Sequence, residues 1–159
     1  MSDQKSTDNT DLPDKSLPNS VLFVCNHNAI RSPMAECLAK NLCGNNIYID
    51  SFGVNEKLSA INPFCISVIE EAGLDISNHT AKHFDDLIDT SFDLIIALTP
   101  EAHKKALEIT KSLTADIEYW PLSDPSETNG NRENIMSAFR AVRDDLHEKI
   151  KKRLCPTGE

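Results

Sequence analysis

Four stretches of this chain have the composition of β-strands, and helices with a clear apolar stripe separate them. The expected strands are residues 20–25, 47–51, 93–98 and 116–120. The first and third are almost continuous apolar runs, which is typical of strands covered on both faces of a parallel sheet. Strands that alternate with helices form βαβ units. The sequence therefore predicts an α/β fold: a single domain with a four-stranded parallel sheet flanked by helices on both faces.

Four helices are expected between and after these strands. Asn62-Pro63 and Thr99-Pro100 are helix-start signals, and the last helix covers about residues 132–154. The apolar positions recur three or four residues apart, so each helix has one face to bury. The four stripes are Ala35, Leu38, Ala39 and Leu42; Cys65, Val68, Ile69 and Ala72; Ala102, Ala106, Ile109 and Leu113; and Ile135, Phe139, Val142, Leu146 and Ile150.

Length and composition exclude several classes of protein. The 159 residues suit one domain, and residues 1–19 are polar, which predicts a disordered tail. No apolar run approaches the roughly 20 residues that cross a bilayer, so we expect no membrane association. The net charge of −9 argues against nucleic acid as a partner. Five irregularly spaced cysteines predict no disulfide framework and a reducing compartment, so we expect a cytoplasmic protein.

The segment between the first strand and the first helix contains residues that could bind an oxyanion and attack it. Cys25 ends the strand, five residues follow, and Arg31-Ser32-Pro33 begins a helix. A short loop at a helix N-terminus turns backbone N–H groups inward, where they can bind a tetrahedral oxyanion and favour the thiolate form of a cysteine. Arg31 can bond two oxygens of a phosphate at once. Ser32 can donate its hydroxyl to the sulfur or cap the helix.

This loop resembles the Cys-x5-Arg-Ser phosphate loop of the low-molecular-weight protein tyrosine phosphatases and of the related thioredoxin-coupled arsenate reductases. The resemblance covers about residues 20–153, and the predicted phosphatase-like domain is residues 20–155. It implies that the nucleophile is Cys25 and that the phosphate loop follows the first strand. The implied substrate-binding residues are Asn26, His27, Asn28, Ala29, Ile30, Arg31 and Ser32. The alternative interpretation of Cys25 is a small buried residue that ends a strand.

The resemblance also assigns a general acid and a supporting set. Asp124 of Asp124-Pro125 matches the family's acid, which protonates the leaving oxygen and later activates water. The alternative is an ordinary turn, because Asp-Pro is a common turn signature. Asn28 and Ser51 match residues that shape the loop, and Ser32 supports the thiolate. For Ser51, a serine that merely ends a strand is an equal alternative.

The sequence departs from the family pattern at three places. His27 stands where the family usually has glycine, and Ile30 replaces the second loop cysteine that could pair with Cys25. Ser126-Glu127 replaces the aromatic pair that often follows Asp-Pro in tyrosine phosphatases, which weakens the case for phosphotyrosine.

His79 and His83 could share a helical face, but no third ligand follows, so we expect no metal site.

The predicted function is a phosphate-monoester hydrolase, a protein tyrosine phosphatase that acts through a cysteinyl-phosphate intermediate without a cofactor. The expected partners are a phosphorylated protein or a small phosphate monoester, and the chain is expected to be a monomer or weak dimer. One alternative is an arsenate reductase that uses an external thiol, because residues 98–103 lack the relay cysteine of the thioredoxin-coupled enzymes. Another is a non-catalytic phosphoprotein-binding module.

Overall fold

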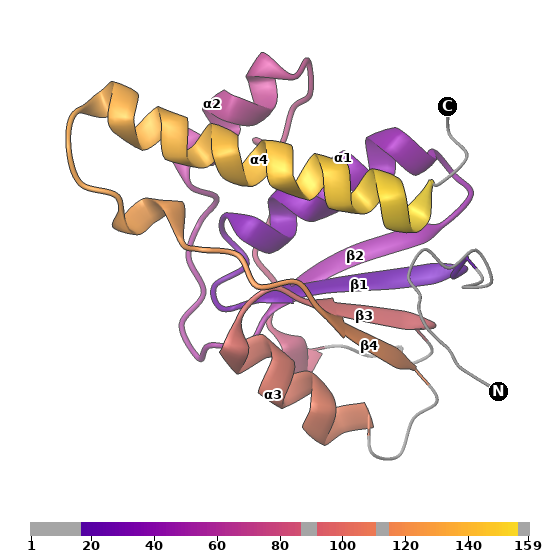
Figure 1. The fold of residues 1–159 in the computed structure, drawn as a ribbon. Coiled ribbons are helices and arrows are strands. Elements are labelled where there is room, and N and C mark those ends of the chain that lie inside the picture. Colours follow the sequence, from indigo (N-terminus) through magenta and orange to yellow (C-terminus); the bar gives the residue numbers. More distant parts are fainter. Residues whose placement is uncertain (1–16, 87–91, 111–114, 156–159) are drawn as a thin grey trace, which may run out of the picture.

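Four parallel strands form one sheet in the order β2-β1-β3-β4 in the computed structural model, which describes residues 17–86, 92–110 and 115–155. The strands are β1 (Ser20–Cys25), β2 (Tyr48–Gly53), β3 (Leu94–Ala97) and β4 (Asp116–Tyr119). The helices are α1 (Arg31–Cys43), α2 (Pro63–Glu71), α3 (Pro100–Ile109) and α4 (Arg132–Leu154), with short 3₁₀ turns η2 (Phe84–Asp86) and η4 (Pro125–Glu127). Helices α1, α2 and α4 lie on one side of the sheet and α3 lies on the other (Figure 1). The predicted α/β fold is confirmed.

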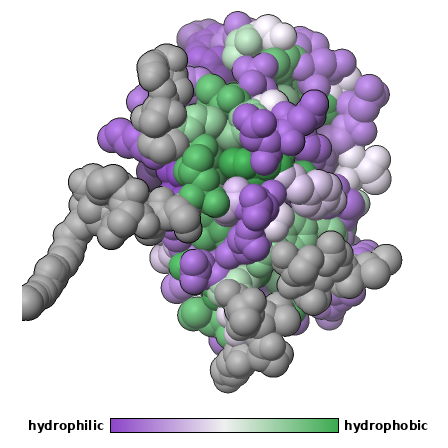
Figure 2. Space-filling view, turned by 90° about the vertical axis from the view of Figure 1, so that its right-hand side faces the viewer, coloured by the Kyte–Doolittle hydropathy of each residue, from purple (hydrophilic) through white to green (hydrophobic). Residues whose placement is uncertain are grey.

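The alternation of side chains along β1 explains the two layers of core. Val21 and Phe23 pack into the larger core beneath α1, α2 and α4, whereas Leu22 and Val24 pack into the smaller core beside α3. All four side chains are fully buried, which is why this strand reads as a continuous apolar run. Seen from the end at which the strands begin, hydrophobic surface gathers in the middle of the face among hydrophilic residues (Figure 2).

The helices begin and end close to where the sequence places them. The side chain of Asn62 accepts hydrogen bonds at the start of α2, and that of Thr99 does so at the start of α3. Ala72 is wrong as a member of the buried stripe, because α2 ends at Glu71 and Ala72 is exposed. Ile135 is only half-buried, and Met136 is the buried residue in that turn of α4. The predicted core position Leu113 lies outside the described residues.

The strand order places the phosphate loop at a switch in topology. Strand β2 pairs with one edge of β1, and the chain later returns to place β3 along the other edge of β1. The C-terminal end of β1 therefore opens into the crevice where ligands of such sheets bind. Strand β2 extends two residues beyond the predicted end, because its pairing with β1 continues until Gly53 lies opposite Cys25.

Two predictions about the chain as a whole stay predictions. Residues 1–16 of the expected tail lie outside the described residues, so the structure says nothing of their order. Within the described part, no helix is both long enough and apolar enough to cross a membrane.

Candidate active site

The backbone of residues 25–30 turns its carbonyl groups away from the centre of the loop. The carbonyls of Cys25 and Asn26 accept hydrogen bonds from the N–H groups of Val54 and Asn55, at 3.0 and 2.9 Å. The carbonyls of His27 and Ala29 accept from Ser59 and Asn62, at 3.5 and 3.0 Å. These contacts occupy the outer side of the loop. They leave its N–H groups to face an anion on the inner side.

Gly53 permits this close approach of backbone to backbone. A Cβ atom at this position would lie 2.7 Å from the carbonyl oxygen of Asn26 and 2.9 Å from the amide nitrogen of Asn28. Neither atom belongs to a flexible side chain, so any larger residue would push the loop out of place. The end of β2 therefore sets the position of the phosphate loop.

Cys25 is buried at the base of the loop, with 2% of its surface exposed. Its Sγ lies 2.9 Å from the Oγ of Ser32, which is in the first turn of α1. When Cys25 is a thiolate, Ser32 must be the donor in this contact, because a thiolate can only accept. Of the two roles open to Ser32, contact with the sulfur is therefore the one found. Ile30 at the N-cap position supplies no side-chain acceptor to the helix.

Asn28 holds the loop from within. Its φ of 54° lies in the left-handed region, which asparagine tolerates better than most residues. Its Nδ2 donates to the Oγ atoms of Ser32 and Ser51, at 2.8 and 3.0 Å. Its Oδ1 accepts from the backbone N–H of Lys82 at 2.9 Å and contacts Nε2 of His79 at 3.0 Å. Every polar atom of this buried amide is used, so its orientation is fixed.

His79 approaches the loop from 51 residues away. Its Nε2 also lies 3.2 Å from the carbonyl oxygen of Asn28, so this nitrogen faces two acceptors and must carry a hydrogen. Burial lowers the pKa of His79 below its usual value, which favours the neutral ring. His79 and His83 share no helical face, because the chain between α2 and η2 is not helical there.

Ser51 extends the network toward the surface. It is fully buried, accepts from Asn28, and donates to Oε1 of Glu36 at 2.5 Å. The second oxygen of Glu36 accepts from Lys40 at 2.6 Å, one turn further along α1. Because Ser51 passes its hydrogen to a carboxylate, it is free to accept from Asn28. Ser51 is thus part of the loop's support and not only the end of a strand.

Arg31 and Asp124 lie close together at the mouth of the loop. Arg31 is the first residue of α1 and is 9% exposed; its Nη1 donates to the carbonyl of Leu122 at 3.0 Å. Its Nη2 lies 3.9 Å from Oδ2 of Asp124. The other carboxylate oxygen, Oδ1, accepts from the backbone N–H and the Oγ of Ser126, at 2.9 and 2.6 Å. Ser126 therefore fixes one oxygen of Asp124 and leaves the other beside the guanidinium.

Asn26 and His27 form part of the rim. The Oδ1 of Asn26 accepts from Thr99 at 2.7 Å, at the start of α3. The ring of His27 contacts the carbonyl oxygen of Lys57 at 3.0 Å and the Nδ2 of Asn55 at 3.3 Å. His27 is exposed, so the residue that replaces the family's glycine points outward from the loop and holds the segment that follows β2.

A hollow of about 160 Å³ lies among these groups, which is small enough to suit a phosphate group rather than a large ligand. Asp124 also lines a separate, wider groove of about 600 Å³ against α4. The residues that line the smaller hollow are Cys25, His27, Ala29, Ile30, Arg31, Ser59, Ala60, Asn62, Asp124 and Ser126. The three residues predicted to be catalytic thus border one cavity, although Asp124 lies far along the chain from Cys25 and Arg31.

Several contributors were not singled out by sequence. Gly53, Glu36, Lys82 and Ser126 act through contacts that no local pattern reveals, apart from the Asp-x-Ser spacing that favours the turn at Asp124. Tyr119 stacks on His103, whereas Trp120 packs against Phe23 and the larger core. Among the described residues, no group of three or more His, Cys, Asp or Glu side chains is arranged to hold a metal ion.

Comparison with known proteins identifies the family. Residues 20–156 match the family described as low molecular weight phosphotyrosine protein phosphatase. The chain belongs to this family. An arsenate reductase of Bacillus licheniformis is 34% identical to this low-molecular-weight phosphatase family member over 140 residues, which are 88% of this chain and 97% of the relative.

Solved structures agree with this assignment. A structure described as an arsenate reductase in the oxidized state superposes with a TM-score of 0.72 at 28% identity, over 87% of this chain and 98% of that one. The tyrosine phosphatase Wzb from Escherichia coli K30 has the same fold, with a TM-score of 0.73 at 21% identity over 88% of this chain and 99% of that one. The matched family is described as a phosphatase family and the Bacillus licheniformis relative is named an arsenate reductase, so this chain is a member of an enzyme family.

Proposed function

We propose that this protein hydrolyses phosphate monoesters, phosphotyrosine among them, through a phosphoryl group carried on Cys25. The observation that supports it most is the common border of Cys25, Arg31 and Asp124 on one small hollow, beneath a loop whose carbonyls point outward. A nucleophile, an anion clamp and a proton donor are the parts that metal-free ester hydrolysis requires. A thiolate nucleophile also needs a reducing compartment, so we propose the cytoplasm.

The reaction proceeds in two displacements. In the first, the thiolate of Cys25 attacks phosphorus, the bond from phosphorus to the ester oxygen breaks, and Asp124 gives that oxygen a proton. In the second, water attacks phosphorus, Asp124 takes a proton from it, and phosphate leaves with the thiolate restored. Arg31 and the loop N–H groups carry the charge that develops on the equatorial oxygens, and Ser32 stabilises the thiolate as it departs.

The surroundings of Asp124 support its role as the acid. Its Oδ1 is held by Ser126, and its Oδ2 lies on the side of Arg31, where the phosphate binds. The same arrangement leaves no aromatic ring directly after Pro125 to stack on a phenyl group. We therefore propose broad activity on phosphate monoesters, in which phosphotyrosine is one substrate.

Arsenate reduction with an external thiol is the second candidate, and the name of the Bacillus licheniformis relative favours it. Arsenate has the shape and charge of phosphate, so the same loop would bind it. An internal relay to Cys25 is not supported by residues 98–103, which contain no cysteine. Cys65 does approach the back of the loop, and its Sγ lies 3.7 Å from the carbonyl oxygen of Ile30, but it is fully buried there. Burial raises the pKa of this thiol to about 12, which disfavours its thiolate.

The test compares two esters with leaving groups of different basicity in the presence of a metal chelator. Wild type, Cys25→Ser and Asp124→Asn are assayed with p-nitrophenyl phosphate and with phenyl phosphate. Asp124→Asn should lower kcat/KM for phenyl phosphate by roughly 10²- to 10⁴-fold and kcat/KM for p-nitrophenyl phosphate far less, because the better leaving group needs no proton in the first displacement. Asp116→Asn, at the exposed start of β4, is the matched control and should behave as wild type.

Arsenate reduction by the same preparations, with a low-molecular-weight thiol supplied, separates the two candidates. Ester hydrolysis that disappears in Cys25→Ser supports the phosphatase. Arsenite formation without ester hydrolysis would assign the chain to the reductases. An equal fall in kcat/KM for both esters in Asp124→Asn would contradict the role of Asp124 as acid.

A further inference from the structure

Two cysteines that take no part in the proposed reaction meet at the far end of the molecule. Cys43 is the last residue of α1, and Cys155 follows the last residue of α4. Their Sγ atoms are 3.1 Å apart, although 112 positions separate them in the sequence. The backbone N–H of Cys155 donates to the carbonyl of Lys151 at 3.0 Å, so this cysteine is held by its own helix. Cys43 is buried and Cys155 is half-buried against the same core.

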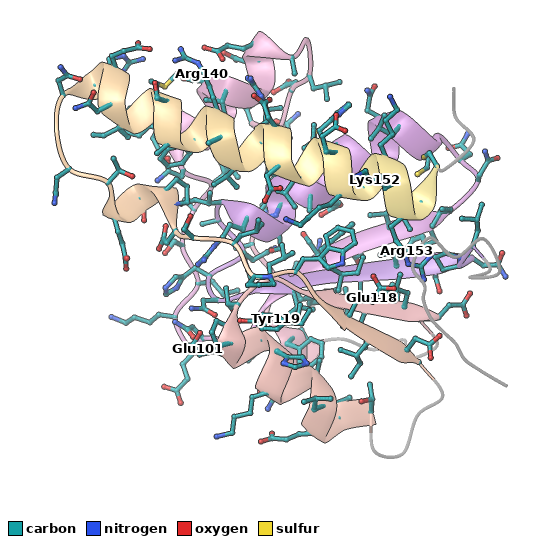
Figure 3. The ribbon with its side chains drawn as sticks, viewed as in Figure 1. Glu101, Glu118, Tyr119, Arg140, Lys152 and Arg153 are labelled. Atoms are coloured by element: carbon teal, nitrogen blue, oxygen red, sulfur yellow. The ribbon has the colours of Figure 1, made fainter. Side chains whose placement is uncertain are left out.

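The end of α4 is fixed in place by a second contact. The Nε of Arg153 donates to Oε2 of Glu118 on β4 at 2.6 Å, and both side chains are mostly buried. Figure 3 shows Arg153 reaching from the end of α4 toward Glu118 on the sheet below. Helices α1 and α4 also pack along one another over the sheet (Figure 1). The two thiols are therefore brought together by the packing of the helices that carry them.

We propose that Cys43 and Cys155 form a reversible disulfide, which fastens the C-terminal end of α4 to that of α1 when the protein meets a hydroperoxide. A disulfide bond is about 2.05 Å long, so the two sulfur atoms need to approach by roughly 1 Å. Both cysteines stand at helix ends, where a change of side-chain rotamer can supply this movement. Neither helix needs to shift along the other.

The chemical step balances with one molecule of hydrogen peroxide. The more exposed thiol, Cys155, attacks one peroxide oxygen as its thiolate; the oxygen–oxygen bond breaks, and the product is a sulfenic acid and water. Cys43 then attacks the sulfenic sulfur, gives up its proton, and releases a second water as the S–S bond forms. The two thiols lose two electrons in total, and the peroxide gains them. A dithiol reductant reverses the reaction by exchange.

Burial and the contact with Cys155 raise the pKa of the Cys43 thiol to about 12, which fits the second step better than the first. The pair is also far from the phosphate loop. Helix α1 has 13 residues and so extends about 20 Å from its first residue, Arg31, to Cys43. Oxidation of the pair is therefore distinct from oxidation of Cys25, and the pair is no relay for the catalytic sulfur.

The disulfide should stabilise the fold because it closes a loop of more than 100 residues. The typical stabilisation by such a bond corresponds to a rise in Tm of roughly 4 to 16 °C for a chain of this size. The expected physiological consequence is a protein that resists unfolding under oxidising stress while its active site remains intact.

The experiment treats the full-length protein with limiting hydrogen peroxide while inorganic phosphate occupies the loop and shields Cys25. Remaining thiols are then alkylated, peptides are analysed by mass spectrometry, and Tm is measured before and after a dithiol reductant. We expect a peptide that links Cys43 to Cys155, a higher Tm that the reductant reverses, and ester hydrolysis at the wild-type rate. Cys155→Ser should show neither the linked peptide nor the rise in Tm, and Cys37→Ser is the matched control that keeps both.

Two results would overturn the proposal. One is complete alkylation of both Cys43 and Cys155 after the protein has consumed one equivalent of peroxide. The other is a reversible rise in Tm of the same size in the Cys155→Ser variant, which would assign the stabilisation to other cysteines. Neither result would contradict the proposed phosphatase activity, because Cys155→Ser leaves the phosphate loop unchanged.

Discussion

Gly53→Ala should damage catalysis by moving the phosphate loop, although Gly53 contacts no substrate. The added Cβ would lie 2.7 Å from the carbonyl oxygen of Asn26, whereas ordinary contacts begin at 3.4 Å. Relief of the clash therefore moves the loop by about 0.7 Å. Because a misplacement of about 1 Å costs roughly 10²-fold in rate, we expect kcat/KM to fall by about 10- to 100-fold. This corresponds to about 1.4 to 2.7 kcal/mol of lost transition-state stabilisation.

The assay is steady-state hydrolysis of p-nitrophenyl phosphate at a temperature well below the Tm of every variant. Gly73→Ala is the control. Gly73 has a φ of 82° after the end of α2, and a Cβ there would meet nothing within 4 Å. This variant should lose roughly 1 to 2 kcal/mol of stability to backbone strain and keep the wild-type kcat/KM. A Gly53→Ala enzyme within twofold of wild type would refute the claim that Gly53 sets the position of the loop.

The remaining predictions concern the network behind the loop. Burial lowers the pKa of His79, so the native state binds fewer protons than the unfolded state. The stability that this residue supplies is therefore complete above about pH 6.5 and declines as the pH falls below that value. His79→Gln should flatten the dependence of Tm on pH between about pH 7.5 and pH 5, and a variant with the wild-type pH profile would contradict this expectation. Ser32→Ala removes the hydroxyl that lies 2.9 Å from the Sγ of Cys25. Alkylation of Cys25 by iodoacetate at neutral pH should therefore slow, and kcat should fall by roughly 10- to 100-fold. Unchanged alkylation and turnover would show that the hydroxyl does not stabilise the thiolate.

The strands and the loop could be predicted from the sequence because each depends on a pattern of neighbouring residues. The apolar run that ends at Cys25 indicates a strand buried on both faces, and Arg31-Ser32-Pro33 marks the helix that follows. The Asp-Pro pair placed Asp124 as a candidate on the basis of family resemblance. Its position on the same hollow as Cys25 agrees with that expectation, and its role as acid stays a prediction.

The supporting contacts could not be predicted because they join segments far apart in sequence. His79 and Lys82 reach Asn28 across more than 50 positions, and nothing in their own neighbourhood marks them as parts of the loop. Gly53 resembles any glycine at the end of a strand until the loop is seen against it. Cys43 and Cys155 likewise become a pair only when α1 and α4 pack together.

Direct detection of the covalent intermediate tests the central claim. Asp124→Asn is mixed with p-nitrophenyl phosphate, quenched in acid during turnover, and analysed by intact-mass and peptide mass spectrometry. The proposed mechanism predicts a phosphoryl group on the peptide that contains Cys25, since loss of the base slows attack by water, and predicts none in Cys25→Ser. Hydrolysis without a phosphoryl group on Cys25, or hydrolysis retained by Cys25→Ser, would contradict nucleophilic catalysis by this residue.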